Sequence, residues 1–197
     1  DTINKLNMPG LELHAFTMLT AFGSPLMNKT STNGVTISLT GADSGTGKSG
    51  SLYAANSVWG HGRDLSVGGI EGATPNGMTG RYLALKNMTF GLDEVGNLDG
   101  RDLSAIVHKI STGKAKIRMQ ASVNAERMHE FSASMIAIFT SNHSLYDKIS
   151  TYKKNANGEV ARLIEFNMKK PKCFDDDPTL GVTLFQPLNT NHGHAGI

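Results

Sequence analysis

A glycine-rich segment, GADSGTGKS at residues 41–49, constrains the fold of this chain more than any other stretch. The residues just before it alternate between apolar and polar, with the apolar ones at Val35, Ile37 and Leu39. This alternation predicts a strand over residues 35–40. After the segment, apolar residues recur at helical spacing, at Leu52, Ala55 and Val58. The sequence therefore predicts a strand, a tight loop and a helix in succession, a unit typical of α/β sheets.

A loop of this kind can bind phosphate. Backbone N–H groups of the loop and of the following helix converge on phosphate oxygens. In the pattern G-x-x-x-x-G-K-[ST], the lysine reaches the β- and γ-phosphates and the hydroxyl ligates Mg²⁺. Lys48 and Ser49 hold these positions, and Ala42 replaces the first glycine, which is tolerable if its φ is negative. The residues predicted to hold the nucleotide are Gly41, Ala42, Asp43, Ser44, Gly45, Thr46, Gly47, Lys48, Ser49 and Gly50.

Two acids, Asp93 and Glu94, end an apolar alternation at Met88, Phe90 and Leu92 about 45 residues after the loop. Hydrolysis of a nucleotide needs a carboxylate for the metal and a base for the attacking water. Carboxyl ends of parallel strands share one edge of a sheet, which would bring these acids to the loop. We expect Asp93 to hold Mg²⁺ and Glu94 to polarise water. The alternative is that both are exposed acids that begin a turn at Gly96.

A third polar group follows a third apolar run, residues 134–140, as Thr140-Ser141-Asn142. Asn142 could contact the γ-phosphate or its attacking water. It could equally cap a short helix over residues 144–150, because asparagine is a favoured helix cap.

Charge is concentrated in one part of the chain. Residues 101–172 carry 13 Lys and Arg against 6 Asp and Glu, although the whole chain has a formal net charge of only +2. Such a stretch can bind nucleic acid or can be an ordinary solvated face. The residues between 114 and 130 are basic and irregular, and we expect a β-hairpin there.

The remaining pattern predicts an α/β domain. We expect helices over residues 11–22 and 99–112, the second capped by Asp99, and a strand over residues 160–168. Residues 60–80 are expected to be mostly loop, and the stretch beyond Pro171 an acidic turn and a tail without clear pattern. These elements suggest a helical lead-in at residues 1–34, a core at 35–170 and a tail at 171–197 that leads to a further segment. The start at Asp1, without methionine, is expected of a piece of a longer protein.

Composition narrows the class of protein. A single cysteine, Cys173, excludes an intramolecular disulfide framework and fits a reducing cytoplasm. No run of 18 apolar residues or secretory leader is visible, so we expect no membrane partner. His192 and His194 lack a nearby cysteine or acid partner and make a weak candidate for a metal site.

The order of these motifs resembles helicase superfamily 3 and its AAA+ relatives. The segments that carry the resemblance are AFGSPLM, SGTGKSGSLYAANSVWG, LDEVGNLDGRDLSAIVHKISTGKAKIRM, TSNHSLYDKIS, RLIEF and NHGHAG. They are most similar to the ATPase domain of phage and plasmid primase-helicase proteins, over about residues 20–197. The resemblance implies a three-layer α/β/α fold with a mostly parallel sheet in the strand order 5-1-4-3-2.

The resemblance also implies roles for individual residues. Asn142 matches the sensor asparagine, and Arg162 matches an arginine finger that enters the ATP site of a neighbouring subunit. A DNA-contacting hairpin of the central pore matches the basic stretch at Lys114, Lys116, Arg118 and Arg127.

The function expected from these features is ATP hydrolysis, with Mg²⁺, coupled to unwinding or translocation of single-stranded or duplex DNA in phage or plasmid replication. The resemblance implies a homo-oligomeric ring, a hexamer, in the bacterial cytoplasm. The alternative is a non-motor nucleotide-binding module for oligomerisation or regulation. A small-molecule kinase is disfavoured because no lid with several arginines follows the third strand.

Overall fold

A parallel sheet of five strands forms the centre of the computed structural model, which describes residues 2–68, 75–113, 132–153, 158 and 161–193. The strands are β1 (Gly34–Thr40), β2 (Ser66–Gly68), β3 (Phe90–Asp93), β4 (Met135–Ser141) and β5 (Leu163–Asn167). Their order across the sheet is β5-β1-β4-β3-β2, and every pairing among them is parallel. The expected α/β class and strand order are confirmed.

The register of the sheet brings the strand ends to one edge. Thr40, the last residue of β1, pairs with Ser141 of β4 and Asn167 of β5, each the last residue of its strand. Leu92 of β3 pairs with Phe139, so β3 ends at nearly the same level. The chain segments that leave β1, β3, β4 and β5 therefore start side by side.

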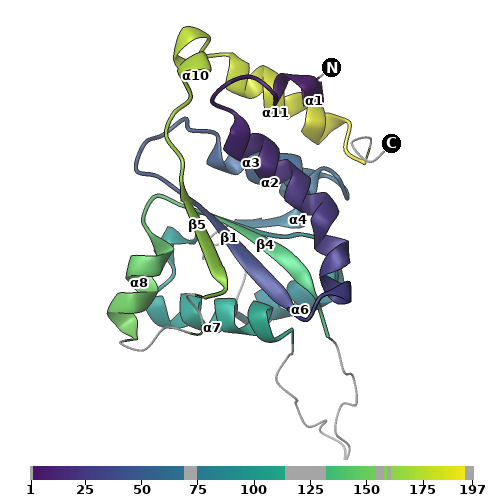
Figure 1. The fold of residues 1–197 in the computed structure, drawn as a ribbon, viewed down its shortest axis with the longest axis vertical. Helices are drawn as coiled ribbons and strands as arrows, with labels where there is room; N and C mark the ends of the chain where they lie inside the picture. The colour runs from purple at the N-terminus through teal and green to yellow at the C-terminus, as the bar shows by residue number, and fades with distance from the viewer. Residues whose placement is uncertain (1, 69–74, 114–131, 154–157, 159–160, 194–197) are drawn as a thin grey trace, which may run out of the picture.

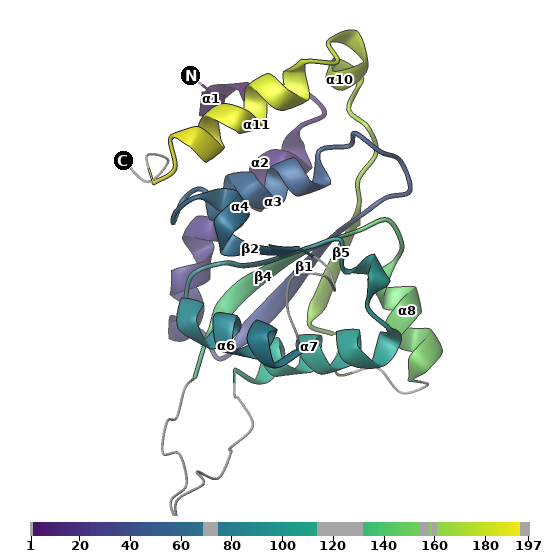
Figure 2. The ribbon, with the colours of Figure 1, turned by 180° about the vertical axis from the view of Figure 1, so that it is seen from behind.

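Helices cover both faces of the sheet, as Figures 1 and 2 show from opposite sides. One face carries α2 (Glu12–Gly23), α3 (Lys48–Asn56) and, outside them, α1 (Thr2–Lys5) and α11 (Leu180–Thr190). The other face carries α6 (Pro75–Leu85), α7 (Gly100–Thr112) and α8 (Leu145–Tyr152). Short 3₁₀ helices, η1 (Ser24–Lys29) and η2 (Val95–Asn97), follow α2 and β3. The three expected layers are present.

The position of β4 between two helical layers explains why this strand is apolar from Met135 to Phe139. Ala137 and Phe139 belong to the core under α6, α7 and α8, whereas Ile138 belongs to the core under α2 and α3. Successive side chains of a strand point to opposite faces, so a strand between two helical layers has no solvent face. A third cluster joins α2, α3, α10 and α11 with the segment between α1 and α2, and includes Leu6, Leu11, Phe174 and Leu184.

The helices α7 and α8 begin at residues whose side chains favour helix caps. The side chain of Asp99 accepts a hydrogen bond from the backbone N–H of Asp102 at 2.7 Å and caps α7 as expected. This helix ends at Gly113, whose φ of 66° suits glycine. Ser144 caps α8 by accepting from the N–H of Asp147 at 3.1 Å.

Two expectations are wrong. Residues 60–80 contain α4 (Gly62–Leu65), β2 and the start of α6, not mostly loop. Elements as short as α4 and β2, with four and three residues, are too short to show a hydrophobic period in the sequence. A tertiary contact also holds β2, because the Ser66 hydroxyl accepts a hydrogen bond from the Asn56 side chain at 2.9 Å. The tail contains α10 (Lys172–Asp176) and α11. Pro187 inside α11 conceals the helix in the sequence, because proline normally breaks one.

No helix in the described part of the chain is long and apolar enough to span a membrane.

Candidate nucleotide site

The glycine-rich loop leaves β1 after Thr40 and enters α3 at Lys48. Its glycines are needed for space as well as for backbone shape. A Cβ at Gly41 would lie 2.5 Å from the carbonyl oxygen of Met168, and one at Gly47, where φ is 86°, would lie 2.6 Å from Nε2 of His14. Among described non-glycine residues only Lys86 and Glu94 have positive φ, so Ala42 meets the condition set by the sequence pattern.

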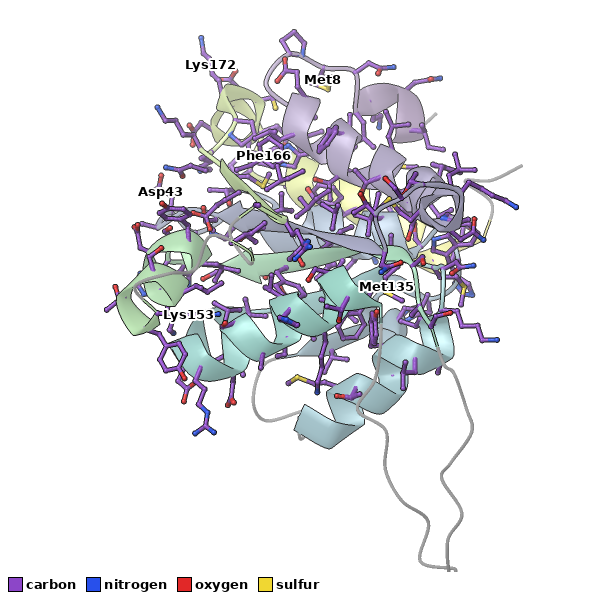
Figure 3. The ribbon with its side chains drawn as sticks, turned by 60° about the horizontal axis from the view of Figure 1, so that its bottom comes forward. Met8, Asp43, Met135, Lys153, Phe166 and Lys172 are labelled. Carbon is purple, nitrogen blue, oxygen red and sulfur yellow. The ribbon has the colours of Figure 1, made fainter. Side chains whose placement is uncertain are left out.

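The Lys48 side chain reaches from the start of α3 back to the first residues of the loop. Its Nζ donates hydrogen bonds to the carbonyl oxygens of Gly41, at 2.6 Å, and Asp43, at 3.1 Å. Burial lowers the pKa of Lys48 from its ordinary value. Figure 3 shows Asp43 at the end of the sheet opposite Met135, the first residue of β4. The loop thus lies at the carboxyl edge, where α/β sheets bind ligands.

Asp93 accepts hydrogen bonds from the side chains of three other residues. Its Oδ1 accepts from the Ser49 hydroxyl at 2.9 Å and from the Thr140 hydroxyl at 2.5 Å. Its Oδ2 accepts from Tyr53 at 2.5 Å. Burial, reinforced by this bond, raises the pKa of the Tyr53 hydroxyl above its usual range, so it remains a donor. Three elements, α3, β3 and β4, together fix this one carboxylate.

The pair Ser49 and Asp93 suits a magnesium ion. Mg²⁺ prefers hard oxygen ligands, and in nucleotide sites it takes one or two from the protein and the rest from phosphates and water. A hydroxyl and a carboxylate in contact supply that set. Among the described residues, no group of three or more His, Cys, Asp or Glu could hold a metal ion. His194 lies outside the described residues, and His192 contacts the carbonyl oxygen of Asn189 through Nδ1 at 3.2 Å.

Glu94 turns away from the sheet directly after Asp93. Its backbone is left-handed, with a φ of 55°, and its N–H donates to Thr140 Oγ1 at 2.9 Å. The side chain is exposed and lines a cleft of about 200 Å³. The other residues around this cleft are Lys48, Ser49, Gly96, Asn97, Thr140, Ser141, Asn142 and His143.

Asn142 is exposed at the edge of two clefts. It lines the cleft of Glu94 and a second one of about 260 Å³ beside Gly41 and Ala42. It does not cap α8, because Ser144 does so and Glu165 accepts from the N–H of Leu145 at 2.7 Å. The helix-cap alternative for Asn142 is therefore wrong.

Arg162 lies away from this cleft. It is exposed just before β5, the edge strand, and its Nη1 donates to the carbonyl oxygen of Gly158 at 3.4 Å. Leu163 pairs with Thr36, four residues before the end of β1, which is about 13 Å at 3.3 Å per residue. The structure does not bring Arg162 to the phosphate loop of its own chain. The basic residues Lys114, Lys116, Arg118 and Arg127 lie outside the described residues.

Sequence reasoning missed three residues of the site, Tyr53, Thr140 as a partner of Asp93, and His14. Tyr53 follows Ser49 by four residues on α3, so helical spacing could have placed both on one face. Thr140 ends its strand next to the strand of Asp93. A lone histidine in the apolar helix α2 gave no signal.

The sheet order, the loop between β1 and α3, and the acids at the end of β3 define the P-loop NTPase-like fold. Residues 5–129 match the family described as domain of unknown function DUF927. This match covers more than half of the chain, which therefore belongs to that family.

A solved structure described as the SCCmec type IV Cch active helicase has a similar fold. The two chains are 22% identical with a TM-score of 0.65, over 100% of this chain and 36% of the other. This chain thus spans about a third of that protein, and the likeness shows the fold alone. The search of curated proteins gave no match.

Proposed function

We propose that this domain is an ATPase motor that couples ATP hydrolysis to unwinding or translocation of DNA. The observation that carries the proposal is the cleft of Glu94 at the carboxyl edge of the sheet. Lys48 and Ser49 of the loop, Asp93 and Glu94 at the end of β3, and Asn142 after β4 all line or adjoin it. A lysine, a metal-binding carboxylate, a second acid and an amide are the groups that nucleotide hydrolysis requires.

Each residue has a distinct task in the proposed reaction. The loop N–H groups hold the phosphates, and Lys48 exchanges its bonds with the Gly41 and Asp43 carbonyls for phosphate oxygens. Ser49 and Asp93 hold Mg²⁺, which neutralises phosphate charge when bound. Glu94 accepts a proton from the attacking water. Asn142, on the same cleft, orients that water or the γ-phosphate.

The proposed assembly is a homo-oligomeric ring, with six copies in the related helicases that the sequence resembles. Arg162 is too far along β5 to reach its own loop but is exposed at the sheet edge. A cation there can enter the site of an adjacent copy. Contact between unlike faces of identical copies forms a closed ring when the rotation from one copy to the next divides a full turn evenly.

DNA is the proposed partner, in phage or plasmid replication in a bacterial cytoplasm. The excess of Lys and Arg over residues 101–172 favours a phosphate backbone as partner. The similar fold belongs to a protein described as an active helicase, which agrees with this proposal.

ATP turnover with and without single-stranded DNA tests the motor. We expect ATPase activity that rises when DNA is added. Lys48→Ala should fold but bind ATP at least ~10-fold more weakly, since it removes a hydrogen bond to a charged group. Binding is followed with a fluorescent ATP analogue, and folding by circular dichroism. A folded Lys48→Ala protein with unchanged ATP affinity would contradict the phosphate-loop assignment. Turnover indifferent to DNA would favour a non-motor nucleotide-binding module.

Removal of basic charge tests the nucleic-acid path. The double variant Lys114→Ala/Lys116→Ala should bind single-stranded DNA more weakly. The slope of log affinity against log salt should become shallower by about 1.4, or 0.7 for each phosphate that the protein no longer neutralises. ATP affinity should stay constant. A control variant removes two other cations, Lys29 and Lys86, which are exposed and lie outside the basic stretch. Equal salt slopes for the parent and the Lys114/Lys116 variant would exclude these residues from the DNA path.

A further inference from the structure

His14 lies behind the phosphate loop, buried in the first turn of α2. Its side chain is 2% exposed, and its Nε2 lies 2.8 Å from the carbonyl oxygen of Thr46 in the loop, 32 residues further along the chain. The ring packs between Phe174, edge-on at 5.6 Å, and Phe185, stacked at 6.0 Å. Nothing in the proposed reaction uses this residue.

The contact with a carbonyl fixes the proton on the ring. A carbonyl oxygen only accepts, so Nε2 carries the hydrogen and Nδ1 is bare. Burial lowers the pKa of His14 from its ordinary value, which keeps the ring neutral. Nδ1 is buried without a hydrogen-bond partner among the described residues. A purely apolar side chain would pack against Phe174 and Phe185 without this unpaired nitrogen, so what the imidazole alone supplies is the Nε2–H.

The bonded carbonyl determines where the next N–H points. In a trans peptide, the C=O of Thr46 and the N–H of Gly47 point in opposite directions. Since this carbonyl is directed back toward α2, the Gly47 N–H is directed away from α2, toward the concave side of the loop. The approach is close, because a Cβ on Gly47 would lie 2.6 Å from Nε2 and 2.9 Å from Cδ2 of the ring.

We propose that His14 is a positioning residue of the phosphate loop. By binding the Thr46 carbonyl from behind, it sets the Gly47 N–H toward a phosphate oxygen of a nucleoside diphosphate or triphosphate. The inference rests on the proposed nucleotide site and adds a residue to it from a helix that precedes β1. Without the bond, the Thr46–Gly47 peptide can rotate, and part of the binding free energy is spent on ordering the loop.

The test compares two substitutions of similar length, His14→Gln and His14→Met, in the purified protein. Glutamine offers an N–H donor to the Thr46 carbonyl, and methionine does not. We expect His14→Met to bind ADP roughly 10-fold more weakly than the parent, because one preset hydrogen bond to a charged group is missing, and His14→Gln to recover most of this affinity. ADP affinity is measured by titration calorimetry without Mg²⁺, so neither hydrolysis nor the metal enters the result. In turnover, the rise in KM for His14→Met should be larger than the fall in kcat.

Control measurements separate positioning from packing. Thr20→Val removes a buried hydroxyl elsewhere on α2, which donates to the Thr17 carbonyl within the helix, and should leave ADP affinity unchanged. Equal ADP affinity for His14→Gln and His14→Met, or a weakening in Thr20→Val as large as in His14→Met, would overturn the positioning role and leave the proposed ATPase intact. If His14→Met fails to fold, His14→Phe, which keeps the aromatic packing without the donor, replaces it in the comparison. A parent protein that binds no ADP would overturn both proposals.

Discussion

Glu94→Gln should bind ATP with parental affinity and hydrolyse it ~10²–10⁴-fold more slowly, the range that general base catalysis contributes. The side chain lines the cleft but does not join the hydrogen bonds around Asp93, so its charge can be removed without loosening the site. Single-turnover hydrolysis of radiolabelled ATP measures the effect on the chemical step. Asp93→Ala is the contrasting variant, because it should also lose the Mg²⁺ dependence of ATP binding. Full turnover by Glu94→Gln would leave Glu94 as a surface acid.

The left-handed backbone of Glu94 adds a stability test to the same position. This conformation costs an L-residue roughly 1–2 kcal/mol, and glycine avoids that cost while losing more chain entropy on folding. Glu94→Gly should therefore stabilise the fold by about 1 kcal/mol and raise the melting temperature by a few degrees, while turnover falls at least as far as in Glu94→Gln. Lys86 has a similar φ of 52° and is exposed away from the cleft. Lys86→Gly should give the same stabilisation with turnover unchanged.

Arg162→Ala should leave ATP binding intact and reduce turnover ~10³–10⁵-fold, as removal of an arginine finger does in other NTPases. The physical reason is its place before β5, where it cannot reach its own loop but can contact a copy packed alongside. Turnover must then depend on protein concentration, because the site is complete only between two copies.

Mixing variants tests this arrangement directly. Arg162→Ala and Lys48→Ala proteins, each inactive alone, should together regain part of the activity. Some interfaces in the mixture pair the intact loop of the first with the intact arginine of the second. Arg162→Lys is a matched variant, because it keeps the charge but lacks the planar fork that grips phosphate. A turnover rate that is independent of concentration and insensitive to Arg162→Ala would exclude the shared site.

The core of the fold was predictable because its strands are buried or alternate clearly. β1, β3 and β4 each carry an apolar pattern that ends in polar residues, and α7 has both an Asp99 cap and a terminal glycine. The α2 helix and its end before Pro25 were also visible. β2 and α11 were not, because one has three residues and the other contains Pro187. Packing of α11 against α1 and α3 outweighs the local preference of its proline.

The residues of the candidate site were predictable where they directly follow a strand or match the phosphate-loop pattern. The residues that bind them from neighbouring helices were not predictable. Lys48, Ser49, Asp93 and Glu94 lie together as the order of motifs required. The second carboxylate oxygen of Asp93 is bound by Tyr53, and the back of the loop by His14. These contacts arise from how α2 and α3 pack. A single sequence shows which residues lie on a helix but not which loop that helix will meet.

The strand order also sets when the protein can fold during its synthesis. Both neighbours of β1 come late: Gly34 pairs with Met135, and Thr36 with Leu163. At 5–20 residues per second, β1 therefore waits at least several seconds for its partners, with Ile37 and Leu39 unsheltered. The phosphate loop takes its final position later still. Its first residue, Gly41, packs on the Met168 carbonyl, and the Met168 N–H donates a hydrogen bond to the Thr40 carbonyl oxygen. The proposed nucleotide site can therefore form only in chains that have been completed past residue 168, so a bound nucleotide would stabilise the finished domain and not the nascent chain.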